Sequence, residues 1–145
     1  MNKDAAIAIA RRIDREPLLN YLYGAPGSGG MAPFQKEFHT AQESKRALIA
    51  ANKLGKSYCG GVEAWLHLLG SSPFRRVPPP GSMGWMLAPD LSTGWATVSA
   101  AMRETEPPGV LSPSCYYVEG IGYTYRGRKI IALSPERGGG LMVGK

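Results

Sequence analysis

Apolar residues recur at helical spacing near the start of the chain. In residues 4–15 they form one stripe with the arginines outside it, and Pro17 ends or kinks the predicted helix. The stripe consists of Ala6, Ile9, Ala10 and Ile13. The sequence GAPGSGG at 24–30 predicts a flexible linker. We therefore expect an N-terminal helix and linker in residues 1–30 and a separate body in residues 31–145.

A helix, a strand and a second helix are predicted next. Residues 33–45 have helical periodicity, with Phe34, Phe38 and Ala41 on one face. The run RALIAA at 46–51 breaks that periodicity and indicates a buried parallel strand. After a short loop, residues 57–69 are helical again, and Gly70 is placed to cap that helix.

The rest of the chain alternates between strands and one helix. GWMLA at 84–88 indicates a second buried strand, and 93–104 a helix that ends before two prolines. The β-rich runs 116–125 and 129–133 form a hairpin that turns at Arg126, Gly127 and Arg128. Alternating helices and strands predict an α/β domain with parallel strands and helices over the sheet, plus this hairpin near the C-terminus.

Composition excludes several classes of protein. A length of 145 residues suits one domain, and 43% apolar residues suffice for a core. Because no apolar run approaches the roughly 18 residues of a membrane span and no signal peptide is visible, we expect a cytoplasmic protein without a membrane partner. Cys59 and Cys115 form no disulfide framework or metal motif, and the two histidines, His39 and His67, stand apart in the sequence.

One segment carries a chemical motif. Residues 50–57 nearly match G-x-x-x-x-G-K-[ST], with Ala50 in place of the first glycine, between a predicted strand and a predicted helix. Backbone N–H groups at a helix N-terminus bind phosphates, and Gly55 would let the chain turn close to them. Lys56 would reach the β- and γ-phosphates, and the Ser57 hydroxyl would ligate Mg²⁺. The predicted nucleotide-binding residues of this loop are Asn52, Lys53, Leu54, Gly55, Lys56 and Ser57.

The flanks of this motif resemble the start of tailed-phage terminase large subunits. The similarity covers residues 33–74 well: a Pro-x-Gln-x-x-Phe stretch, an Arg-led apolar strand, a loop with Asn before Gly-Lys-Ser, and a helix that contains Glu and His. The residues that carry it are Pro33, Gln35, Phe38, Arg46, Asn52, Gly55, Lys56, Ser57, Glu63, His67, Gly70, Pro73 and Phe74. The resemblance implies a P-loop NTPase-like three-layer fold and an ATP- and Mg²⁺-dependent motor that packages DNA.

The resemblance also implies partners and further site residues. Double-stranded DNA, the procapsid portal, the small terminase subunit and a homo-oligomeric ring are the partners of such a motor. Gln35 matches a position that contacts adenine in similar ATPases, and its alternative is an exposed helix residue. Lys53 and Arg46 resemble basic residues near the phosphate loop, and solvated surface charges are the alternative for both.

The acidic motif of the family is missing. We find no apolar strand that ends in Asp-Glu, since Asp90, Glu119 and Glu136 lack the preceding apolar run, and no nuclease carboxylate cluster. The expected fold is therefore incomplete: the N-terminal part of an ATPase domain that binds ATP and does not hydrolyse it efficiently alone, so that enzymatic activity is an open question.

Two competing interpretations remain. A net charge of +6 suits a polyanion, and alternating tyrosines beside basic residues in the C-terminal hairpin could stack single-stranded nucleic acid. A basic nucleic-acid-binding module without ATPase activity is thus the alternative. A cysteine nucleophile at Cys59 is disfavoured, because His39 precedes it and His67 lies two turns along the same helix. The tyrosines and basic residues are Tyr116, Tyr117, Tyr123, Tyr125, Arg126, Arg128 and Lys129.

Overall fold

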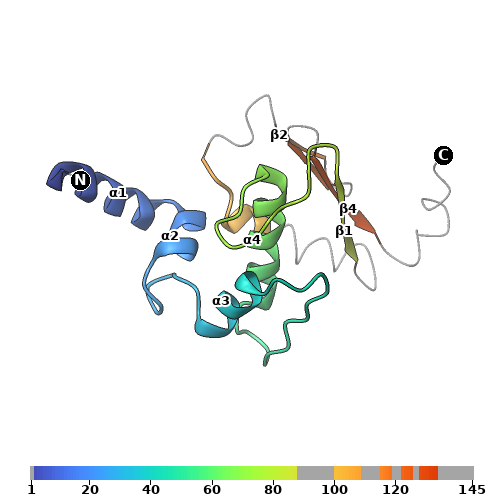
Figure 1. Ribbon diagram of the computed structural model, residues 1–145, viewed down its shortest axis with the longest axis horizontal. Helices are drawn as coiled ribbons and strands as arrows, with labels where there is room; N and C mark the ends of the chain where they lie inside the picture. Colours follow the sequence, from blue (N-terminus) through green and yellow to red (C-terminus); the bar gives the residue numbers. More distant parts are fainter. Residues whose placement is uncertain (1, 88–99, 109–114, 119–121, 126–127, 134–145) are drawn as a thin grey trace.

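The computed structural model describes residues 2–87, 100–108, 115–118, 122–125 and 128–133, and Figure 1 shows the order of its elements. The helices are α1 (Lys3–Arg15), α2 (Pro17–Tyr23), α3 (Pro33–Thr40) and α4 (Lys56–Leu69). The strands are β1 (Met83–Leu87), β2 (Cys115–Val118), β3 (Gly122–Tyr125) and β4 (Arg128–Leu133). Residues 100–104 are also helical.

Helix α4 lies at the centre of the fold. It buries an apolar stripe that includes Val62, Trp65 and Leu68, each with 0% of its surface exposed. Leu18 and Tyr21 of α2 pack into the same cluster. A fully buried aromatic or aliphatic side chain contributes roughly 1.5–3 kcal/mol relative to exposure, so this stripe is a principal source of stability. The prediction of this helix and of its cap is confirmed: Gly70 adopts the left-handed conformation (φ 68°), and its N–H bonds to the last turn.

The sheet is mixed, with strand order β1-β4-β3-β2. β1 pairs with β4 in parallel, Trp85 opposite Ile131, whereas β3 pairs antiparallel with both β2 and β4. The strand predicted at 84–88 is present as β1, but its predicted burial is wrong, because Trp85 is 58% exposed. The predicted pairing of the two β-rich runs is confirmed by the antiparallel register of β3 and β4. The single run predicted at 116–125 is two strands, β2 and β3, paired with each other.

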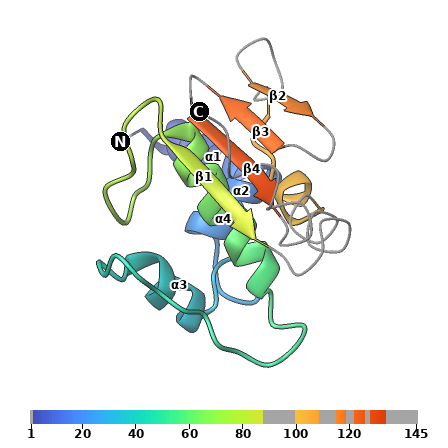
Figure 2. The ribbon, with the colours of Figure 1, turned by 90° about the vertical axis from the view of Figure 1, so that its right-hand side faces the viewer.

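The described helices α2, α3 and α4 lie on one side of this sheet, and α4 packs against β3 and β4 (Figure 2). The three-layer P-loop arrangement therefore stays a prediction. The helix expected at 93–104 is described only from residue 100 onward, and Asp90, Glu119, Arg126, Gly127 and Glu136 lie outside the described residues.

The strand predicted at 46–51 is wrong. The segment forms no strand, and none of its residues pairs with another backbone segment within the part of the chain that the structure describes. The run lacks a neighbouring strand, and its most hydrophobic side chain, Ile49, is 93% exposed. A buried parallel strand requires cover on both faces, which this segment does not receive.

Helix α3 is shorter than the predicted 33–45 because side chains satisfy its final carbonyls. The Thr40 hydroxyl donates to the carbonyls of Lys36 and Glu37 (2.9 and 3.2 Å), and Arg46 Nη1 donates to the carbonyl of Phe38 (2.7 Å). The Arg46 contact replaces the N–H donor that a further turn would supply to the Phe38 carbonyl, whereas the Glu37 carbonyl also accepts the N–H of Ala41.

The N-terminal region is divided between an exposed helix and a packed turn. α1 buries no residue and extends from the body in Figure 1. The glycine-rich segment 24–30, which we expected to be a flexible linker, is held by hydrogen bonds: Ser28 and Gly30 N–H donate to the Ala25 carbonyl, and Met31 N–H to the Tyr21 carbonyl. With α2 in the core, this turn leaves no break in packing at residue 30.

Candidate functional site

The loop before α4 has two residues in the left-handed conformation, Lys53 (φ 64°) and Gly55 (φ 77°). The positive φ favours glycine at residue 55, and a Cβ there would also lie 2.9 Å from Gln35 Nε2, at the end of a side chain that could move aside. Asn52, Lys53 and Leu54 are exposed around this turn. The predicted loop residues thus surround a sharp turn directly before a 14-residue helix.

Lys56, the first residue of α4, folds back across the loop. Its ammonium donates to the carbonyls of Ala50 and Ala51, both at 2.7 Å. A lysine ammonium has three N–H donors, so these two contacts leave one for another acceptor. Ala50, which replaces the first glycine of the motif, contributes through its carbonyl, which any residue type would provide.

The start of α4 offers further donors. Cys59 is the first residue of the helix whose N–H reaches a backbone carbonyl, that of Gly55 (2.9 Å). Within the described structure, the N–H groups of Lys56, Ser57 and Tyr58 have no backbone acceptor, as is usual for a first turn. Together with the helix dipole, these groups favour an anion at this end.

The same residues fit a Mg²⁺-bound phosphate chain in part. Ser57 is exposed at the start of α4, where its hydroxyl could ligate the ion. Mg²⁺ takes its other ligands from phosphate oxygens and water, and usually from a carboxylate. No group of three His, Cys, Asp or Glu side chains that could hold a metal occurs among the described residues. The loop therefore offers N–H donors, an ammonium and one hydroxyl.

Gln35 lies against the loop and is 7% exposed, which excludes the exposed-residue alternative. Its Nε2 donates to the carbonyl of Gly55 (3.3 Å), and its Oε1 accepts from the N–H of Ala32 (2.9 Å), the residue before α3. Gln35 therefore links α3 to the last loop residue. The adenine contact remains a prediction for this residue.

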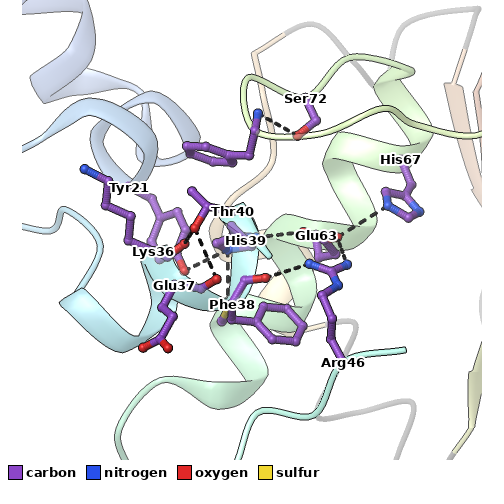
Figure 3. A network of polar contacts seen from close by, with 12 residues as sticks. Tyr21, Lys36, Glu37, Phe38, His39, Thr40, Arg46, Glu63, His67 and Ser72 are labelled. Carbon is purple, nitrogen blue, oxygen red and sulfur yellow. Dashed lines mark hydrogen bonds and ion pairs between the residues drawn. The ribbon is translucent and has the colours of Figure 1, made fainter. Parts of the chain in front are cut away.

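Behind the loop, Glu63 of α4 collects several polar contacts (Figure 3). Its Oε1 accepts from Arg46 Nη2 at 2.5 Å, and its Oε2 lies 2.7 Å from His39 Nδ1. His67 Nε2 lies 3.4 Å from Oε1, one turn along α4. The two histidines that are far apart in sequence thus approach the same carboxylate, and Arg46, 12% exposed on its side chain, is paired rather than solvated.

The charge states of this cluster follow from its contacts. Burial raises the pKa of Glu63, but the contacts with His39, His67 and Arg46 outweigh burial and hold its pKa well below the ordinary value. Burial lowers the pKa of His39, but hydrogen bonds to Cys59 and Glu63 outweigh it and raise the pKa to about 9. Because an ionised carboxylate only accepts, His39 Nδ1 carries a proton.

The other ring nitrogen of His39 corrects our interpretation of Cys59. Nε2 lies 3.3 Å from Cys59 Sγ and 3.1 Å from the Tyr21 hydroxyl. Cys59, His39 and Glu63 therefore contact one another in the same sequence of thiol, imidazole and carboxylate as a cysteine-protease triad. The position of His39 before Cys59 in the sequence was therefore the wrong argument against a Cys59 nucleophile. The right argument is burial: Cys59 and His39 are each 0% exposed, and a nucleophile must reach its substrate.

A cleft of about 410 Å³ lies on the other side of α3. Phe34, Phe38 and Ala41, the apolar face predicted for this helix, line it together with the unpaired segment 45–49. Arg46 also lines the cleft, and its guanidinium carbon lies 4.6 Å from the centre of the Phe38 ring.

The sequence analysis missed the cluster around Glu63. One signal was available: Glu63 adjoins the apolar stripe of α4, where a carboxylate requires a partner. The partners come from residues 17 and 24 positions away, and that separation is not visible in the sequence.

Comparison with known proteins leaves the family open: no family model, no curated protein and no solved structure matches the chain. Among the described helices, none combines the length and apolar character that crossing a bilayer requires.

Proposed function

We propose that the loop at residues 50–57 binds the phosphates of an adenine nucleotide with Mg²⁺. The observation that supports it most is Lys56: its ammonium, held on two loop carbonyls with one donor left over, stands beside unpaired N–H groups at the start of α4. Lys53 and Gly55 give the loop its left-handed turns. This combination suits a phosphate chain better than a solvated surface turn, in which a lysine would extend into water.

The wider proposal takes its content from the resemblance to terminase large subunits. On that basis the chain is the ATP-binding part of a viral DNA-packaging motor, with double-stranded DNA, a portal, a small terminase subunit and a homo-oligomeric ring as partners. Phosphoryl transfer also requires a group that orients water and charges that stabilise the transition state. Among the described residues, no carboxylate forms a hydrogen bond or ion pair with residues 50–57, so we expect nucleotide binding with negligible turnover by this chain alone.

Calorimetric titration of the folded chain with MgATP tests the binding proposal. We expect Lys56→Ala to abolish measurable binding, whereas Lys36→Ala, which removes an exposed charge on α3, should bind like the wild type. Equal affinity of the wild type and Lys56→Ala would rule out the loop as the site. Steady-state phosphate release near one per second that disappears in Lys56→Ala would overturn the expectation of negligible turnover.

A further inference from the structure

The nucleotide loop has an N-terminal and a C-terminal flank: the first contacts Glu63, and the second contains it. The C-terminal flank is α4 itself, which carries Glu63 two turns beyond Lys56. The N-terminal flank begins at Arg46, whose guanidinium donates to Glu63 Oε1 (2.5 Å) and to the Phe38 carbonyl (2.7 Å). The intervening residues 47–49 have no backbone partner among the described residues. Within that part of the chain, Arg46 attaches the start of this flank, and the Lys56 ammonium attaches its end through the carbonyls of Ala50 and Ala51.

Helix α3 is attached to the same frame at two points one turn apart. Gln35 contacts the carbonyl of Gly55 at the end of the loop, and His39, four residues later on the same face, contacts Glu63. The side chain of Glu63 is 15% exposed and that of His39 is 0% exposed, so both interactions are largely shielded from water. Charge-assisted hydrogen bonds of this kind hold their partners in defined directions.

We propose that Glu63 is a positioning residue for the nucleotide loop: by holding Arg46 and His39 together, it fixes the distance between the segment that enters the loop and the helix that leaves it. This inference rests on the proposed nucleotide site, which Glu63 does not itself contact. Without the carboxylate, Arg46 retains only the Phe38 carbonyl and the Phe38 ring, and residues 47–55 acquire more conformations. A loop that must be ordered before it binds has a lower apparent affinity.

The test compares Glu63→Gln with Glu37→Gln, the same chemical change at an exposed position of α3. Two quantities are measured on the full chain: MgATP affinity by calorimetry, and backbone hydrogen exchange. We expect Glu63→Gln to bind roughly three- to thirty-fold more weakly, and its exchange to rise in residues 47–56 more than in the second half of α4. Arg46→Lys, which keeps the charge and the His39–Glu63 contact, should show an intermediate loss; it also replaces Glu63→Gln if that variant does not fold.

The outcomes separate the two proposals. If the wild type and Lys56→Ala bind alike, the nucleotide site is wrong, and the exchange data still decide the positioning role. If the wild type binds nucleotide and a folded Glu63→Gln binds equally well, Glu63 is not a positioning residue. Exchange that rises uniformly over α3 and α4, without excess in residues 47–56, would likewise show a general stabilising role and overturn the inference.

Discussion

Replacement by alanine should have different effects on stability at two adjacent glycines of α4, Gly60 and Gly61. A Cβ on Gly60 would meet no atom within 4 Å. A Cβ on Gly61 would lie 3.0 Å from the carbonyl carbon of Ala101 and 3.1 Å from the N of Met102. Replacing a helical glycine with alanine stabilises a helix by up to about 1 kcal/mol at either position. At Gly61 this gain is opposed by a contact that the neighbouring backbone must relieve.

That backbone has little freedom to move. Trp65 Nε1 donates to the Met102 carbonyl (2.7 Å), and the Thr105 hydroxyl donates to the Ala101 carbonyl (2.9 Å). Inserting one methyl into a well-packed core typically costs about 1–3 kcal/mol. We therefore expect Gly60→Ala to raise the free energy of unfolding by about 1 kcal/mol, and Gly61→Ala to be less stable than Gly60→Ala by about 1–3 kcal/mol.

Urea denaturation followed by circular dichroism measures both variants on one scale. With a slope of about 1–3 kcal/mol per molar urea, the two midpoints should differ by roughly 0.3–3 M. Gly60→Ala is the matched control, because it makes the same helical change one residue away without the contact. Equal stabilisation by the two substitutions would refute the packing of residues 100–105 against α4.

Three further predictions concern other parts of the chain. His39 faces Glu63 and Cys59 of α4 and Tyr21 of α2, while Arg46 and His67 face Glu63. The pKa of His39 is raised to about 9, so its protonated form stabilises the fold by on the order of 3 kcal/mol. This contribution should be complete below about pH 6.5 and lost as the pH rises through 9. Denaturation midpoints across this range should decline less in His39→Gln, and parallel curves would contradict the assignment. Gly30→Ala should destabilise the chain by about 1–3 kcal/mol relative to Ser28→Ala, since its Cβ would lie 2.2 Å from the Gly24 carbonyl oxygen; an unchanged thermal midpoint would be inconsistent with the packed turn. If the chain binds duplex DNA through its +6 charge, log affinity should fall against log salt with a slope of about −0.9 per phosphate contact, and salt-independent or sequence-selective binding in a fluorescence assay would argue against this mode.

The sequence predicted correctly those elements that depend only on neighbouring residues. The cap at Gly70 needs only a residue that tolerates positive φ after an apolar helical stripe, and the pairing of β3 with β4 needs only two β-rich runs around a short polar break. The failures involve distant partners. The apolar run 46–51 predicted a strand, but a strand forms only where another strand accepts its hydrogen bonds, and composition does not locate that neighbour.

The sequence also failed to predict which face of helix α3 is buried. Its apolar residues Phe34 and Phe38 are half-buried along a cleft, whereas Gln35 and His39 face the core. Periodicity alone would place the phenylalanines inside. The polar face is inside because each of its members has a specific partner, and those partners, Gly55 and Glu63, belong to a region that follows 20 or more residues later.

These polar contacts also explain how the candidate loop is held in the absence of a strand at residues 46–51. In a strand–loop–helix phosphate site, pairing within a sheet fixes the segment that enters the loop. Here Arg46 and Glu63 make that connection through side chains, and His39 adds α3 to the same carboxylate. The Glu63 side chain is 15% exposed and contacts two cationic partners, so removing its carboxylate would leave both Arg46 and His39 without that acceptor. The geometry of the loop therefore depends on one ionised group of α4 more than on the hydrophobic run that precedes the loop.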